Sequence, residues 1–156
     1  MRLRSLLSGL IVIVALTPAF AAGQYSPDGS IDVESIWARM APNEPDTASV
    51  FFEVLNVGNK PDVLLSASSP VAKKITLRRG RWKGLNFFNR QTDEIKIKAD
   101  SRTSFHPGDL EVTLSEFTEP VGVRSVIPVT LIFKDAGPVT IEATVSNQLL
   151  GNRIAK

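Results

Sequence analysis

The sequence lacks cysteine and contains only one histidine and two methionines, one of which is the initiator. Without cysteine, disulfide bonds and thiol redox chemistry are excluded. The scarcity of imidazole and thioether groups leaves few ligands for a soft metal ion such as Cu(I). Long apolar runs are missing after the first 21 residues, so no later segment is expected to cross a membrane.

The first 21 residues have the features of a secretory signal. Arg2 and Arg4 form a basic start, Leu6–Leu16 is apolar, and Ala19–Ala21 is a small-x-small cleavage site. We expect cleavage after Ala21 and export to the periplasm. An uncleaved membrane anchor is the alternative, but the apolar run is short for a spanning helix of about 20 residues.

Charge is balanced once the signal is removed. The chain has 18 basic and 16 acidic residues, and the signal holds two of the basic ones and no acidic residue. The mature chain therefore has a formal net charge of zero. About 135 residues remain, enough for one domain that buries about two thirds of its unfolded surface.

Short apolar segments separated by turn residues predict a domain built from β-strands. Ile31–Met40 alternates between apolar and polar residues, with a slip in the period that indicates a β-bulge. Asp135–Pro138 joins two strongly alternating segments and predicts a hairpin. Such spacing favours a β-sandwich or barrel. The strand candidates are 31–40, 49–56, 62–68, 73–79, 94–98, 111–114, 126–133 and 139–145.

This pattern divides the chain into a signal peptide (1–21), a polar leader (22–30), one β domain (31–146) and a C-terminal tail (147–156). Three aromatic residues of the domain, Trp37, Phe51 and Phe52, are expected to pack in its core, because large apolar side chains are usually buried.

A set of short motifs is distributed over the mature chain. They are Trp37-Ala38-Arg39, Asn56-Val57-Gly58, Asp62-Val63-Leu64, Ser68-Ser69-Pro70-Val71-Ala72, Pro107-Gly108, Pro128-Val129-Thr130-Leu131 and Ala136-Gly137. In this order and spacing they resemble the PCuAC family, periplasmic copper chaperones that help to load copper into cytochrome oxidase. The resemblance covers nearly all of the mature chain. It implies an all-β, cupredoxin-like Greek-key sandwich of one domain.

The resemblance also implies where a copper site would lie. The family binds Cu(I) through His-x10-Met-x21-His-x-Met, and alignment on Ile75–Leu77 places these ligands at Arg78, Asn89, Glu111 and Thr113. The spacing is retained, but none of the four residues is His or Met. Arg has no lone pair to donate, and at about 4 Å and a dielectric constant near 20 its charge would repel a cation by on the order of 4 kcal/mol. We therefore expect a degenerate copper site and no cofactor, with copper as the alternative.

Two interpretations of the altered position stay open. Arg78 and Glu111 would face each other there and could pair through a bidentate bond. The pair is either an exposed cross-strand ion pair worth at most about 1 kcal/mol or part of a polar recognition site for a small anionic or carbohydrate group. A relocated metal site is a further alternative, since His106, Asp109 and Glu111 lie close in sequence and could bind Zn(II) or Cu(II). A surface or hydrogen-bonded turn histidine is the simpler interpretation of His106.

Basic residues are concentrated in one segment. Residues 73–102 contain ten basic and three acidic residues, a net charge of +7, so the rest of the mature chain carries −7. Basic residues interleaved with aromatic ones suit protein interfaces, anionic membrane surfaces and acidic glycans. The alternative is a solvated basic hairpin whose aromatic side chains close the core. The candidate partner-binding residues are Arg79, Arg81, Trp82, Lys83, Phe87 and Phe88.

The sequence therefore predicts a binding protein. No nucleophile–base motif surrounds any of its serines, so we expect no enzymatic activity. The leading hypothesis is a non-enzymatic periplasmic accessory protein that has lost Cu(I) binding and engages a protein or an anionic envelope component, with peripheral membrane contact as an option and nucleic acid excluded by compartment. A copper chaperone with a relocated or weak site, and a purely structural role, are the alternatives.

Overall fold

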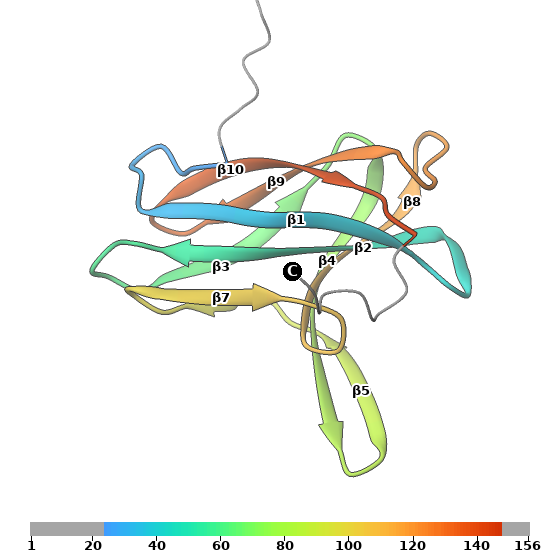
Figure 1. The fold of residues 1–156 in the computed structure, drawn as a ribbon, viewed down its shortest axis with the longest axis horizontal. Coiled ribbons are helices and arrows are strands. Elements are labelled where there is room, and N and C mark those ends of the chain that lie inside the picture. The colour runs from blue at the N-terminus through green and yellow to red at the C-terminus, as the bar shows by residue number, and fades with distance from the viewer. Residues whose placement is uncertain (1–23, 148–156) are drawn as a thin grey trace, which may run out of the picture.

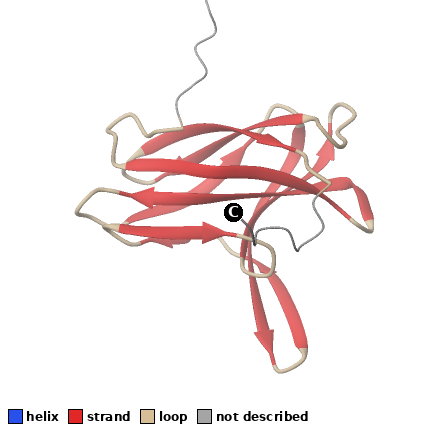
Figure 2. Ribbon diagram, viewed as in Figure 1, coloured by secondary structure: helices blue, strands red, loops and turns tan. Residues whose placement is uncertain are grey.

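The computed structural model describes residues 24–147, with backbone only at Pro45 and Trp82, and shows an all-β fold in this range (Figures 1 and 2). The predicted signal peptide and the tail beyond Asn147 lie outside the described residues. Within the described part, no helix is long and apolar enough to span a membrane.

The strands form two sheets, which confirms the predicted β-sandwich class. The larger sheet has the order β1-β2-β7-β8-β4-β5, and the smaller has the order β10-β9-β3-β6. The first six strands are β1 (Ile31–Ala41), β2 (Glu44–Asn56), β7 (Ser101–Phe105), β8 (Leu110–Phe117), β4 (Ala72–Lys83) and β5 (Asn86–Gln91). The other four are β10 (Gly137–Thr144), β9 (Val126–Phe133), β3 (Asp62–Ser68) and β6 (Ile95–Ile97).

The core lies between the inner faces of the two sheets. Alternate residues of each strand point inward, which gives β9 its repeating pattern of buried and partly exposed positions. In the larger sheet Phe52 stacks on Phe105 with ring centroids 4.2 Å apart. Leu110, Val112 and Leu114 of β8 are buried in the same cluster. The intervening residues of β8 therefore lie on the outer face of the larger sheet, where the candidate site is found.

Phe51 is buried as expected, but neither Phe51 nor Trp37 belongs to the cluster between the two sheets. Phe51 precedes Phe52 on β2, and successive strand residues point to opposite faces. Phe51 is fully buried, but it pairs with Trp37 on the outer face, with ring centroids 4.5 Å apart and the Arg39 guanidinium 5.8 Å from the Phe51 ring. An aromatic pair thus covers part of the outer face next to β8.

All eight predicted strands are present, and two further strands were not predicted. The bounds of β3 and β9 agree with the sequence pattern, and the predicted bulge lies between Glu34 and Trp37. The predicted hairpin joins β9 to β10, with Gly137 at a φ of 81°. Strands β5 and β7 carry no apolar alternation that would have revealed them.

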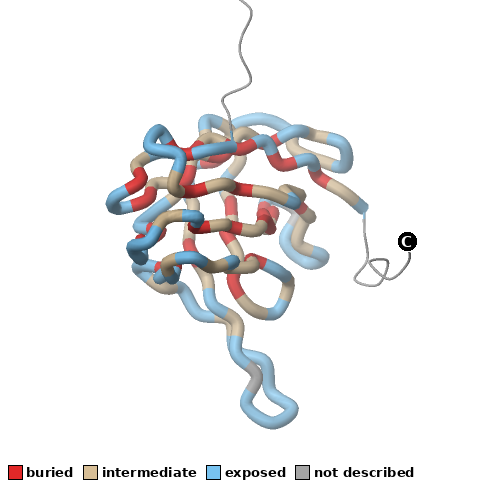
Figure 3. The backbone as a smooth tube through the Cα atoms, turned by 60° about the vertical axis from the view of Figure 1, so that its left-hand side comes forward, coloured by how far each residue is buried: buried red, intermediate tan, exposed pale blue. Residues whose placement is uncertain are grey.

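The β4–β5 hairpin projects from the body of the sandwich (Figure 1) and is mostly exposed (Figure 3). Phe87 and Phe88 are 41% and 42% exposed. The alternative that these aromatic side chains close the core is therefore wrong.

Candidate functional site

The four positions matched to copper ligands come from three strands of the larger sheet. Arg78 on β4 is paired in register with Glu111 on β8, and Thr113 follows two residues later on the same face. Asn89 is on β5, opposite Gly80. The structure therefore brings Arg78, Asn89 and Glu111 together, although Arg78 and Asn89 are separated from Glu111 by a long stretch of sequence.

Glu111 is the centre of this cluster, and its side chain is only 13% exposed. Asn89 Nδ2 donates to Glu111 Oε1 at 2.5 Å, while Arg78 Nη2 donates to the Asn89 carbonyl oxygen at 3.3 Å. Arg78 Nε lies 4.0 Å from Glu111 Oε1, so the expected pair forms without the bidentate bond. The guanidinium and the amide together link β4, β5 and β8.

Three buried polar atoms in and beside this cluster make no hydrogen bond within the described part of the chain. They are Arg78 Nε, Asn89 Oδ1 and Thr113 Oγ1. Thr113 is paired with Thr76 on β4 and with Ser49 on β2, so it lies in the middle of the sheet. The cluster is thus only partly satisfied by its own members.

The residues at these positions do not fit Cu(I). A guanidinium donates no lone pair, and amide, carboxylate and hydroxyl oxygens are hard ligands that match this soft ion poorly. Elsewhere, His106 Nε2 lies 3.8 Å from Asp109 Oδ2, and both side chains are about half exposed. Glu111 does not join them, and among residues 24–147 no three His, Asp or Glu side chains form a metal-binding group.

The β4–β5 hairpin has two different faces. Residues paired across an antiparallel ladder share a face, and Arg79 pairs with Arg90 while Arg81 pairs with Phe88. We call the face that carries Arg79, Arg81, Lys83, Phe88 and Arg90 the basic face. Arg78, Gly80 and Asn89 lie on the opposite face, together with Phe87. The predicted partner-binding residues are therefore divided: Phe88 lies on the basic face, and Phe87 lies on the opposite one.

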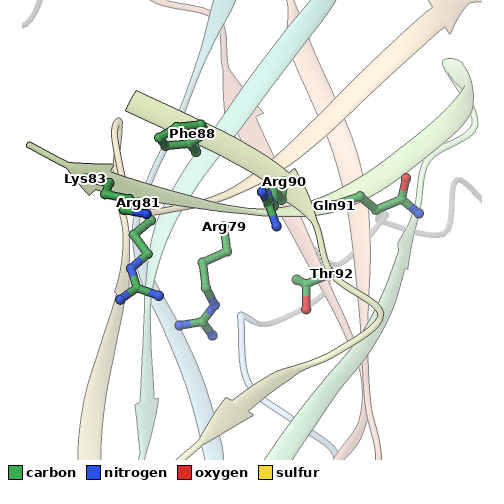
Figure 4. Close-up of a pocket in the computed structure, with 7 residues that line it drawn as sticks. All are labelled: Arg79, Arg81, Lys83, Phe88, Arg90, Gln91 and Thr92. Carbon is green, nitrogen blue, oxygen red and sulfur yellow. The ribbon is translucent and has the colours of Figure 1, made fainter. Parts of the chain in front are cut away.

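The basic face lines an open concavity of about 610 Å³ (Figure 4). In Figure 4 the guanidinium groups of Arg79 and Arg81 point the same way, beside Arg90. The lining contains no carboxylate, and none of its four cations forms a salt bridge within the described residues. The lining residues are Arg79, Arg81, Lys83, Phe88, Arg90, Gln91 and Thr92.

Arg90, Gln91 and Thr92 were not among the predicted partner-binding residues. Arg90 shares the period of two with Phe88, so its place on the basic face could have been inferred once residues 86–91 were known to form a strand. That strand could not be recognised from the hydropathy pattern, because neither of its faces is buried.

Gly80 fixes where the hairpin leaves the sandwich. Its backbone N–H donates to the Asp109 carbonyl oxygen at 2.5 Å. A Cβ at this position would lie 2.7 Å from the Gly108 carbonyl oxygen and 2.7 Å from Phe87 Cζ. Only a residue without a side chain allows the turn before β8 to approach β4 so closely.

Comparisons with known proteins agree with this architecture. Residues 31–145 match a family model described as "putative lipoprotein LpqE-like". The copper-bound PCuAC domain from PmoF2 is 26% identical over 77% of this chain and 95% of that domain, with a TM-score of 0.64. Its apo form is 27% identical over 76% of this chain and 90% of that domain, with a TM-score of 0.61.

Cu(I)-DR1885 from Deinococcus radiodurans is 21% identical over 83% of this chain and 85% of that protein, with a TM-score of 0.58, which shows the fold alone. No curated protein sequence matches the chain. The cupredoxin-like fold implied by the sequence motifs is thus confirmed.

Proposed function

The chain belongs to the LpqE-like family and has the fold of PCuAC domains, and on that premise we propose that it is a non-enzymatic, exported accessory protein that binds an anionic partner and no longer holds Cu(I) at the inherited site. The partner is a protein or a component of the cell envelope. The observation that carries this proposal is the basic face, where four cations line one concavity without a carboxylate.

Loss of Cu(I) binding is supported by the residues at the four inherited positions. Arg78 keeps a fixed positive charge there, and the Glu111 oxygen nearest to it already accepts a hydrogen bond from Asn89. A competition titration of residues 22–156 with Cu(I) and with Cu(II) tests this part. We expect a dissociation constant above about 1 μM, which corresponds to a binding free energy weaker than about 8 kcal/mol.

A matched positive control is available on the same scaffold. The variant Arg78→His/Asn89→Met/Glu111→His/Thr113→Met places imidazole and thioether groups at the inherited spacing. We expect this variant to bind Cu(I) at least about a thousandfold more tightly than the native chain, because both the repulsion and the ligand mismatch are removed.

A copper chaperone with a relocated site is the second candidate. It is favoured by the similarity to the copper-bound PmoF2 domain and by the approach of His106 to Asp109 at 3.8 Å. Submicromolar copper binding by the native chain that disappears in His106→Ala would support this candidate and contradict the proposed loss of copper.

Binding of an anionic partner is tested by retention on a polyanion at rising salt. Arg79→Ser/Arg81→Ser/Lys83→Ser removes three charges from the basic face, and Lys73→Ser/Lys96→Ser/Lys98→Ser removes three exposed charges elsewhere. We expect only the first variant to elute at much lower salt. Equal elution of both variants would show that net charge, and not the basic face, causes retention.

The proposed location is the periplasm or envelope, in agreement with the predicted signal peptide and with the family's description as lipoproteins. The sequence contains no cysteine, so no lipid can be attached through a cysteine sulfur. Fractionation of cells and N-terminal sequencing of the exported chain test the location, and we expect a mature N-terminus at Ala22.

A further inference from the structure

We propose that the basic face is a site for phosphate esters and that it selects phosphate groups over carboxylates of equal charge; this inference rests on the proposed function and names the chemistry of its ligand. The strands place the Arg79 and Arg90 Cα atoms directly opposite each other, and Arg81 follows two residues after Arg79. Such positions are about 5 Å and about 7 Å apart, so three guanidinium groups can reach one ligand.

Direct opposition of two arginines has no structural benefit, because like charges across a ladder destabilise the sheet. The larger sheet contains a second such pair, Glu34 on β1 opposite Glu53 on β2. There the fold supplies its own counterion, since Arg102 forms salt bridges with both carboxylates. The Arg79–Arg90 pair has no equivalent within the described residues. The missing counterion is what a bound anion would provide.

Phosphate fits this arrangement better than a carboxylate does. Each guanidinium offers a planar fork that binds two oxygens of a phosphate or carboxylate. A carboxylate has only two oxygens in one plane, whereas a tetrahedral phosphate has oxygens directed toward several sides and can accept from three arginines at once. Three arginines around one concavity therefore favour the tetrahedral anion.

The rest of the concavity points to an ester and not to free phosphate. Its volume of about 610 Å³ lies in the range of small-molecule sites and is far larger than one phosphate. Phe88, which is 42% exposed, gives one wall an apolar surface for the carbon part of the ligand. A glycerol or sugar phosphodiester, as a repeat of an envelope polymer or as a lipid headgroup, matches both features.

The test compares two soluble polymers, poly(glycerol phosphate) and polyglutamate, matched in the number of charges. Binding is measured by calorimetry at an ionic strength of about 0.15 M, where weak long-range attraction is screened. A third probe, vesicles of phosphatidylglycerol in phosphatidylcholine, presents the same phosphodiester on a lipid. We expect at least about tenfold tighter binding to the phosphate polymer than to polyglutamate, a difference of about one logarithmic unit.

Three variants separate phosphate selection from simple charge. Arg79→Lys/Arg90→Lys keeps both charges but removes the planar forks, and it should lose the preference for phosphate while its affinity for polyglutamate is retained. Arg79→Gln/Arg90→Gln should weaken binding to both polymers at least about tenfold. Lys96→Gln/Lys98→Gln removes two exposed charges in and just after β6 and should change neither affinity by more than about twofold.

Each outcome decides between the two proposals. Equal binding of both polymers, lost in Arg79→Gln/Arg90→Gln, would overturn phosphate selection and leave the anionic partner in place. No binding of any probe would overturn both. Preference for the phosphate polymer supports a soluble source, and binding to the vesicles alone supports a lipid headgroup.

Discussion

The larger sheet contains two like-charged cross-strand pairs, and the fold treats them in opposite ways. Glu34 and Glu53 face each other on β1 and β2, and Arg102 on the neighbouring strand β7 pairs with both. Arg79 and Arg90 face each other at the edge of the same sheet, with no carboxylate in the lining of the concavity. The charges of the acidic pair are thus compensated within the fold, whereas those of the basic pair have no carboxylate partner among the described residues.

The repulsion between Arg79 and Arg90 is small enough for the folded protein to tolerate. Two charges about 6 Å apart repel by about 0.7 kcal/mol in water, and salt reduces this further. A protein can carry such a penalty in an exposed hairpin, because its folding depends mainly on the buried core. An anion bound between the two guanidinium groups would be attracted by both and would offset this repulsion.

The largest effect is expected from Gly80→Ala, which disturbs β4 next to Arg79, where the hairpin that carries the basic pair leaves the sandwich. The added methyl group would meet backbone atoms of Gly108 and the ring of Phe87 at less than 3 Å. Since backbone cannot move aside cheaply, we expect a loss of about 2 kcal/mol in the free energy of unfolding, measured with urea.

Gly122→Ala is the matched control, because a Cβ at Gly122 meets nothing within 4 Å. We expect it to change the free energy of unfolding by less than about 0.5 kcal/mol. If Gly80→Ala were as stable as this control, the close approach of β4 to the turn before β8 would have no role in holding the hairpin.

Sequence patterns revealed the body of the sandwich better than the hairpin, for a physical reason. β3 and β9 were predicted with their observed bounds because each has one face in the core, and burial imposes the period of two. β5 has one Phe on each face and is exposed along most of its length, so neither face is buried in the core. Its strand conformation comes from pairing with β4, and its sequence shows no alternation of apolar and polar residues.

The same limit applied to the candidate site. The resemblance to the PCuAC family, with the ligand spacing it implies, was enough to place Arg78 opposite Glu111. The division of the basic run into two faces could not be seen without the register of β5, so Arg90 was overlooked and Phe87 was grouped with the basic face. Phe51 was misplaced for a related reason: hydrophobicity predicts burial, but not on which side of a sheet.

The next effect in size concerns Arg78, which is adjacent to Arg79 but has a carboxylate partner. Glu111→Gln removes the charge that faces Arg78 and weakens the acceptor of the Asn89 hydrogen bond. A hydrogen bond to a charged group is worth about 1 kcal/mol more than a neutral one, so we expect a loss of about that size in urea unfolding.

Glu119→Gln provides the comparison, because Glu119 is exposed and forms no salt bridge within the described residues. Its effect should be within about 0.5 kcal/mol. A Glu111→Gln variant that is no less stable than this control would mean that the cluster of Arg78, Asn89 and Glu111 on the outer face of the sheet does not stabilise the hairpin against β8.

The smallest and most specific effect is that Arg102→Gln and Arg90→Gln should change the free energy of unfolding in opposite directions. The first variant leaves Glu34 and Glu53 opposed without their counterion and should lower stability by about 0.5 kcal/mol, because the three side chains are largely solvated. The second relieves the repulsion with Arg79 and should raise stability by about 0.5 kcal/mol at low salt. Both differences should vanish near 1 M salt, where the Debye length falls to about 3 Å. If both variants changed the free energy of unfolding in the same direction at low salt, the contrast between the two pairs would not be electrostatic. The missing counterion of the basic pair would then give no argument for a bound anion.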